Sequence, residues 1–155
     1  MTYQIHALDP TPFQPRFSLS DAQLRIHQAE WRTVTNSPGF PCRVTLQDAP
    51  VGAQVLLVNH TSVPGPSPYA ATHAIFIRPG YAAAQLLPGT IPEMLKRRTL
   101  SLRAFTADMD MVAAKVTDGH ALHDTLCDLL SNTSVDSVHI HNAAPGCYAA
   151  CARRI

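Results

Sequence analysis

The segment HIHNAAPGCYAACARR, residues 139–154, gathers the side-chain types that most often do chemistry in proteins. Two histidines stand one residue apart, an asparagine follows them, and two of the chain's four cysteines come shortly afterwards. VDSVHIH reads as a strand, NAAPG as a turn and CYAACARR as a returning strand. The sequence therefore predicts a polar site at the end of a hairpin.

One interpretation is a metal site. His139 and His141 would project from the same face of a strand, with Cα atoms about 6.5–7 Å apart, so both imidazoles can converge on one atom. This geometry suits zinc or another transition metal such as iron or copper. The candidates for further ligands are Asn142, Cys147, His60 and His73. The alternative is a chance pairing in a chain with eight histidines, because no spacing indicates a third ligand.

A second interpretation is a nucleophilic thiol. Cys147 follows Gly146 at the predicted turn, where exposed backbone N–H groups can stabilise an anion. Cys147 would be the nucleophile, His139 or His141 its base, and Asn142 the group that orients the imidazole. The alternative is a small buried thiol at the start of a strand, which is the commoner role of an unbridged cysteine.

The arginines of the predicted strands offer a third interpretation. Arg43, Arg78 and Arg103 lie in or at the ends of three separate strand patterns. If two of them point into the same hollow as the histidine pair, their planar guanidinium groups would hold a carboxylate or a phosphate. The alternative is that these arginines lie on a solvated face.

Composition argues against several classes of function. The 12 Lys and Arg against 11 Asp and Glu leave a net charge of +1, which provides no field to hold nucleic acid or an anionic membrane. The N-terminus MTYQIHALDP lacks a secretion signal, and no stretch approaches the roughly 18 apolar residues of a membrane helix. We therefore expect a cytoplasmic protein with reduced thiols and with neither nucleic acid nor membrane as partner. Nucleotide-binding glycine motifs, a Gly-x-Ser-x-Gly elbow and a His-Glu-x-x-His motif are missing.

The elements that must position these residues follow from hydrophobic periodicity. Ser20 and Gln23 form a capping box for a helix from about Asp21 to Trp31, and a leucine stripe that begins at Leu122 predicts a second helix ending near Asn132. Strands are expected at residues 3–8, 43–46, 54–60, 73–78, 99–105, 111–116, 135–141 and 147–154. The segment TSVPGPSPYAAT, residues 61–72, is expected to be a long loop.

These elements predict an α+β fold. A chain of 155 residues that is 46% hydrophobic and 15% charged is expected to form a single domain over residues 1–155. We expect one mixed or mainly antiparallel sheet of about seven or eight strands with two helices packed on it.

Four segments together resemble a known family. GFPCRVTLQDAPVGAQVLLVNH, SPYAATHAIFIR, RRTLSLRAF and HIHNAAPGCYAACARR occur in the order found in a small bacterial family called domain of unknown function 1203. The resemblance covers residues 39–154 and implies no activity. The residues at the family's motif positions are Cys42, Arg43, Pro68, Tyr69, Arg103, His139, His141, Asn142, Gly146, Cys147 and Tyr148. Polar groups from four separated segments suggest one shared pocket.

Two classes of function stay open. A binding module would hold a small anionic molecule or a metal, with Arg43, Tyr69, Arg103 and Tyr148 as ligand-binding candidates. An enzyme would use Cys147, His141 and Asn142 as catalytic residues, or a metal held by His139 and His141. The sequence leaves open the ligand, the cofactor and the oligomeric state, a homodimer included.

Overall fold

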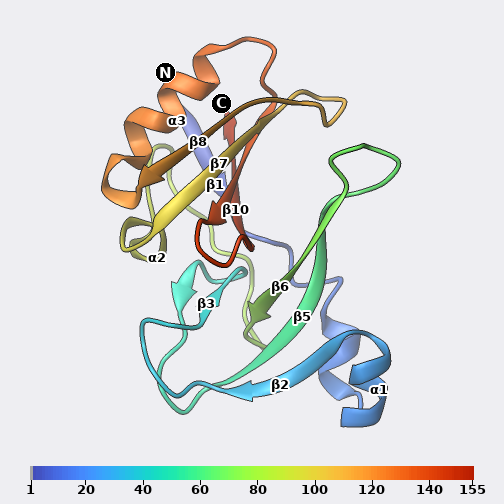
Figure 1. Cartoon of the computed structure of the whole chain (residues 1–155). Helices are drawn as coiled ribbons and strands as arrows, with labels where there is room; N and C mark the ends of the chain where they lie inside the picture. The colour runs from blue at the N-terminus through green and yellow to red at the C-terminus, as the bar shows by residue number, and fades with distance from the viewer. Residues whose placement is uncertain (1) are drawn as a thin grey trace.

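The computed structural model describes residues 2–155, and its ten strands form two five-stranded sheets (Figure 1). The first sheet is antiparallel throughout and has the order β1-β10-β9-β7-β8. Its strands are β1 (Tyr3–His6), β7 (Thr99–Phe105), β8 (Met111–Asp118), β9 (Ser137–Asn142) and β10 (Tyr148–Arg154). The predicted hairpin at the C-terminus is thus confirmed as β9 and β10, which pair directly.

The second sheet has the order β2-β5-β6-β3-β4. Its strands are β2 (Ala29–Thr33), β3 (Pro41–Cys42), β4 (Gln47–Asp48), β5 (Gln54–Val63) and β6 (Ala71–Ile77). Its pairs are antiparallel except for β3 and β6, which run parallel, with Cys42 opposite Phe76. Strands β3 and β4 have only two residues each, which is too short for a periodic pattern to predict. Residues 43–46, which were expected to form a strand, form the turn between them.

The mixture of mainly antiparallel strands and few helices agrees with the expected α+β class. The prediction of a single sheet with seven or eight strands is wrong, because the strands divide between two sheets. The prediction of two helices also falls short. Residues 2–155 contain the α-helices α1 (Asp21–Ile26), α2 (Glu93–Lys96) and α3 (Leu122–Ser131), together with the short 3-10 helices η1 (Gln14–Ser18) and η2 (Gly119–Ala121). No helix among these residues is long and apolar enough to cross a membrane.

The first helix begins as predicted but ends early. Ser20 and Gln23 form the expected capping box, in which each side chain bonds the other residue's backbone N–H. The helix stops at Ile26, and Gln28 takes a left-handed conformation with φ of 52°. The chain then enters β2, where Trp31 pairs with Leu56 of β5. Aromatic and β-branched residues in this segment favour the strand over a continued helix.

Helix α3 fixes which face of the first sheet is polar. Its leucine stripe packs in the main core with alternate residues of β7 and β9, among them Leu100, Leu102, Val138 and Ile140. Because side chains alternate along a strand, the intervening residues of β7 and β9 point to the opposite face. These are Ser101 and Arg103 on β7 and His139 and His141 on β9.

A long hairpin from the second sheet runs beside the first sheet. Strands β5 and β6, drawn in green in Figure 1, extend further than expected, and their loop covers residues 64–70 rather than 61–72. At its tip Ser67 donates a hydrogen bond to the Met109 carbonyl near the β7–β8 turn, at 3.3 Å. His60 and His73 form a cross-strand pair on this hairpin, and their rings contact Tyr148 and His141 of the first sheet.

Candidate functional site

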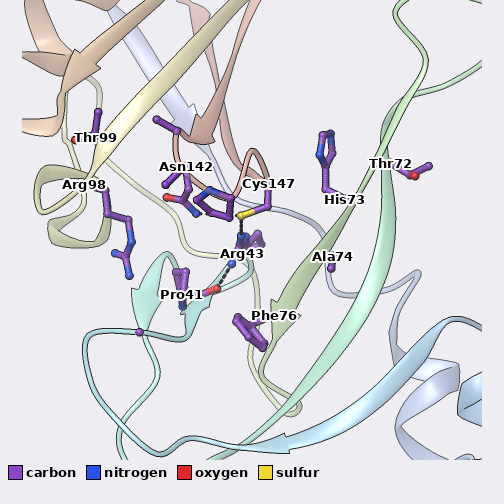
Figure 2. Close-up of a pocket in the computed structure, with 14 residues that line it drawn as sticks. Pro41, Arg43, Thr72, His73, Ala74, Phe76, Arg98, Thr99, Asn142 and Cys147 are labelled. Atoms are coloured by element: carbon purple, nitrogen blue, oxygen red, sulfur yellow. Dashed lines mark hydrogen bonds between the residues drawn. The ribbon is translucent and has the colours of Figure 1, made fainter.

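A cavity of about 770 Å³ lies between the two sheets (Figure 2). Its wall is formed by β3 and the residue that follows it, by β6, by the start of β7 and by the turn from β9 to β10. The charged and polar side chains that line it with nitrogen or sulfur atoms are Arg43, His73, Arg98, Asn142 and Cys147. Figure 2 shows Arg98 and Asn142 on one side of this space and His73 on the other, with Arg43 and Cys147 between them. The cavity is large enough for a small-molecule ligand.

Arg43 is buried at the wall of this cavity, with only 1% of its surface exposed. Its backbone is fixed by a hydrogen bond from its N–H to the Phe76 carbonyl, at 3.1 Å, where β3 runs beside β6. In the side chain, Nε donates to the Tyr148 carbonyl at 2.7 Å, Nη1 donates to the Pro41 carbonyl, and Nη2 donates to the Cys147 sulfur at 3.0 Å. Two of the five guanidinium N–H groups therefore have no partner within residues 2–155.

The guanidinium of Arg43 has no carboxylate partner among residues 2–155. Burial lowers the pKa of Arg43, and the neighbouring Cys147 sulfur opposes that effect. Arg98, which also lines the cavity, differs in this respect because Asp48 binds it through both carboxylate oxygens, at 3.0 and 2.5 Å. A buried charge without a counter-charge costs free energy, so Arg43 is the group of this site that a bound anion would stabilise most.

Cys147 begins the return from the β9–β10 turn. The turn is closed by a hydrogen bond from the Asn142 N–H to the Cys147 carbonyl at 2.9 Å, and it requires Gly146 in the left-handed region, with φ of 74°. The sulfur accepts from the Asn142 side chain Nδ2 at 3.4 Å as well as from Arg43. Asn142 is 6% exposed, and its Oδ1 is buried without a hydrogen-bond partner in the described part of the chain.

The predicted Cys–His pairing does not form in this geometry. His141 donates from Nδ1 to the Gly146 carbonyl at 3.0 Å, which fixes the neutral tautomer, and its buried Nε2 has no partner in the described residues. Asn142 contacts the sulfur of Cys147 instead of orienting the imidazole. The turn therefore presents the thiol to a guanidinium and an amide rather than to a base.

Four histidines and Tyr148 form an aromatic layer between the β5–β6 hairpin and the first sheet. The ring centroids of His73 and His141 are 4.9 Å apart, and Tyr148 lies 5.5 Å from both His60 and His139. Burial is the main cause that lowers the pKa of His60 and of His139 to about 4, and that of His141 to about 3. The charge of Arg103 adds to this effect at His139 and His141. Burial thus favours the neutral form of these imidazoles.

The geometry does not support the expected metal site. His139 and His141 share a face, as predicted, with ring centroids 6.4 Å apart. Among residues 2–155, however, no group of three or more His, Cys, Asp or Glu side chains is arranged to hold a metal ion. Both rings pack against Tyr148 edge to face, at 87° and 88°, instead of converging with a further ligand.

The other predicted ligand-binding residues lie away from the cavity wall. Tyr69 is 38% exposed and meets Phe105 edge-on, with ring centroids 6.3 Å apart. Arg103 pairs in register with His139 on the polar face of the first sheet. Tyr148 contributes its backbone carbonyl to Arg43, whereas its side chain is buried among the histidines, which raises its pKa. Of the candidates, the cavity brings together Arg43, His73, Asn142 and Cys147.

Sequence reasoning missed Arg98 and Thr99, which line the cavity at the start of β7. The only sequence signal was the basic stretch EMLKRR before a predicted strand, and such stretches usually lie on a solvated face. His73 was expected only as a candidate metal ligand, and its place at the cavity wall depends on how β6 lies against the first sheet.

The chain was compared with known families, curated proteins and solved structures. A family model described as "Protein of unknown function (DUF1203)" matches residues 39–154. No curated protein matches the chain, and no solved structure does. The matched range contains every residue that lines the cavity.

Proposed function

Because the chain belongs to the DUF1203 family, whose description assigns no activity, we propose a function from the cavity itself: it binds a small anionic molecule, a carboxylate or a phosphate, at Arg43. The observation that carries this proposal is the buried guanidinium without a carboxylate partner in residues 2–155. An anion in the cavity would provide the missing counter-charge and use the two remaining N–H groups.

The rest of the cavity wall supports an anionic ligand. No Asp or Glu is among the described residues that line it, so an entering anion meets no like charge there. Asp48 balances the charge of Arg98, so Arg98 and the Thr99 hydroxyl add hydrogen-bonding capacity rather than net charge. Ala74, Ala143 and Ala144 leave room, and Phe76 provides an apolar surface for a short carbon chain.

Calorimetric titration with three probes tests the proposal: acetate, succinate and inorganic phosphate. We expect at least one probe to bind the parent protein in the millimolar range or tighter, and Arg43→Met to abolish that binding. Arg43→Lys keeps the charge but loses the planar pair of donors, so we expect weakened binding in that variant. Arg153→Met removes an exposed arginine outside the cavity wall and serves as the control.

Two results would overturn the proposal. One is that none of the three probes binds the parent protein. The other is that Arg43→Met, shown to be folded by its circular dichroism spectrum and thermal transition, binds the probe as tightly as the parent does.

Catalysis by a pair of Cys147 and His141 is the weaker candidate. It would require the His141 ring to leave the Gly146 carbonyl and reach the sulfur. The donors that contact the sulfur are Arg43 and Asn142, and neither is a base at neutral pH.

A further inference from the structure

We propose that Cys147 is a peroxide-reactive thiol that regulates the anion site: its oxidation to a sulfenic acid occupies the space and the donors that the anion needs. This inference deepens the anion-binding proposal, and its regulatory half rests on that proposal. It starts from three features of the same corner of the cavity, namely the sulfur, the guanidinium beside it and the unpartnered amide oxygen of Asn142 (Figure 2).

The sulfur is surrounded by groups that stabilise negative charge. Arg43 donates to it from a buried, unpaired guanidinium at 3.0 Å, and Asn142 donates at 3.4 Å. Hydrogen bonds from a cationic donor favour the charged form of an acceptor, and the thiolate is the reactive form of cysteine. Cys147 is partly exposed and lines the cavity, so a molecule as small as hydrogen peroxide can reach it.

The buried Oδ1 of Asn142, which has no partner in the described residues, indicates that the site can accept a hydrogen-bond donor. This oxygen belongs to the same carboxamide whose nitrogen contacts the sulfur, and it is a buried acceptor without a donor in the described residues. The S–H group of a reduced thiol is only a weak donor for it. A sulfenic acid carries an O–H group that can donate to this oxygen, while its own oxygen can accept from Arg43.

The chemistry balances with hydrogen peroxide as the oxidant. The sulfur of Cys147 attacks one peroxide oxygen, and an S–O bond forms as the O–O bond breaks. The departing hydroxide takes the thiol proton and leaves as water. The sulfur loses two electrons to the peroxide, and the product is the sulfenic acid, which a thiol can reduce again.

Occupation of Arg43 by either group should exclude the other. An anion bound at the two remaining N–H groups of Arg43 balances the guanidinium charge that stabilises a charged sulfur, so it should slow oxidation. The added oxygen on Cys147 takes the same donors and part of the cavity, so it should weaken anion binding.

The first arm of the test measures where oxidation occurs. Reduced full-length protein is treated with hydrogen peroxide in the presence of dimedone, which traps sulfenic acids, and peptide mass spectrometry follows each cysteine with time. We expect labelling of Cys147 about tenfold faster than that of Cys127, because its sulfur has a cationic donor. Asn142→Leu should slow labelling of Cys147 and leave that of Cys127 unchanged. Equal rates at the two cysteines, or an unchanged rate in Asn142→Leu, would overturn the inference.

The second arm measures coupling, with whichever of acetate, succinate and phosphate binds tightest. We expect the probe to slow labelling of Cys147 and peroxide to weaken binding of the probe, whereas Cys147→Ser should bind it equally before and after peroxide. If the reduced protein binds the probe but peroxide leaves binding unchanged, the regulatory inference is wrong and the anion site stands. If Cys147 is labelled but no probe binds, the anion proposal fails and the regulation fails with it.

Discussion

The Arg43 guanidinium and the Cys147 sulfur lie 3.0 Å apart, although 104 positions separate them in the chain. Arg43 follows β3 of the second sheet, and Cys147 precedes β10 of the first. Their hydrogen bond therefore joins the two sheets across one corner of the cavity. The same contact underlies both proposals, because it joins a buried cation to a cysteine sulfur at the cavity wall.

The buried histidines predict a loss of stability in acid. Their pKa values, about 4 for His139 and about 3 for His141, lie below 6.5, the ordinary value that an unfolded chain restores. The folded state thus binds fewer protons, so its stability is fully present above pH 6.5 and falls as the pH drops towards 4. We expect protonation of these two residues in the unfolded chain to lower the free energy of unfolding by about 2–3 kcal/mol between pH 7 and pH 4.5. This figure is about half of what the pKa shifts alone give, because residual hydration of the rings reduces the effect.

Urea denaturation as a function of pH measures this loss. His139→Gln should flatten the dependence between pH 6.5 and pH 4.5, because it removes one of the groups that must take up a proton on unfolding. His27→Gln changes an exposed histidine at the C-terminus of α1 and serves as the matched control. Identical slopes for all three proteins would contradict the assignment of the acid sensitivity to the buried rings.

An acidic residue in the cavity should repel an anion. Asn142→Asp adds a negative charge to a residue of the cavity wall with almost no change in volume. We expect binding of the tightest probe anion to weaken by at least about tenfold, because like charges in a poorly hydrated site repel strongly. Asn132→Asp, at the exposed end of α3, introduces the same charge away from the cavity. Equal affinities of the two variants for the probe would show that Asn142 does not face the ligand.

Substitution of the left-handed Gly146 in the β9–β10 turn should affect both stability and anion binding, and a second glycine can distinguish the two effects. A Cβ at Gly146 would meet no heavy atom within 4 Å, so Gly146→Ala should cost only the backbone strain, about 1 kcal/mol. Gly80→Ala has the same open surroundings and a similar φ, 83° against 74°, and lies outside the cavity wall. The two variants should have similar melting temperatures in thermal denaturation. Titration with the probe anion should reveal weaker binding in Gly146→Ala alone, since its turn carries Asn142 and Cys147.

The histidine pair should not hold a metal with stoichiometric occupancy. His141 uses Nδ1 for the Gly146 carbonyl, and no third ligand converges with it and His139 in the described chain. Elemental mass spectrometry of untagged protein, after zinc is supplied and excess is removed, should detect far less than one metal per chain. His139→Ala/His141→Ala should give the same content. One metal per chain in the parent, lost in the double variant, would require the two rings to rearrange.

The hairpin that carries the site was predictable because its signals are local. The polar ends of two strand patterns and a Pro-Gly turn predicted that Asn142 and Cys147 would lie close together, and a backbone hydrogen bond joins them. The position of Arg43 was not predictable, because it depends on a two-residue parallel strand beside β6. His73 and Arg98 likewise enter the cavity through the packing of separate segments, which no periodicity encodes.

Local patterns gave wrong predictions for segments that can adopt either a local structure or a strand paired with a distant segment. The helix expected to run to Trp31 ends at Ile26, because the segment that follows finds a partner in β5. The long loop expected at residues 61–72 is shorter, since β5 and β6 pair beyond His60 and His73. In both cases pairing with a distant strand outweighs the local preference, as is common for β structure.

The most direct test of the anion site is the NMR signal of the Arg43 guanidinium itself. Arginine side-chain Nε–Hε resonances are recorded while acetate, succinate or phosphate is added, with the Arg43 signal assigned by its loss in Arg43→Lys. We expect a saturable shift of the Arg43 resonance, and none for the exposed Arg153, as the probe fills the cavity. An Arg43 resonance that stays unchanged up to saturating probe concentrations would contradict the account, whether or not the probe binds elsewhere.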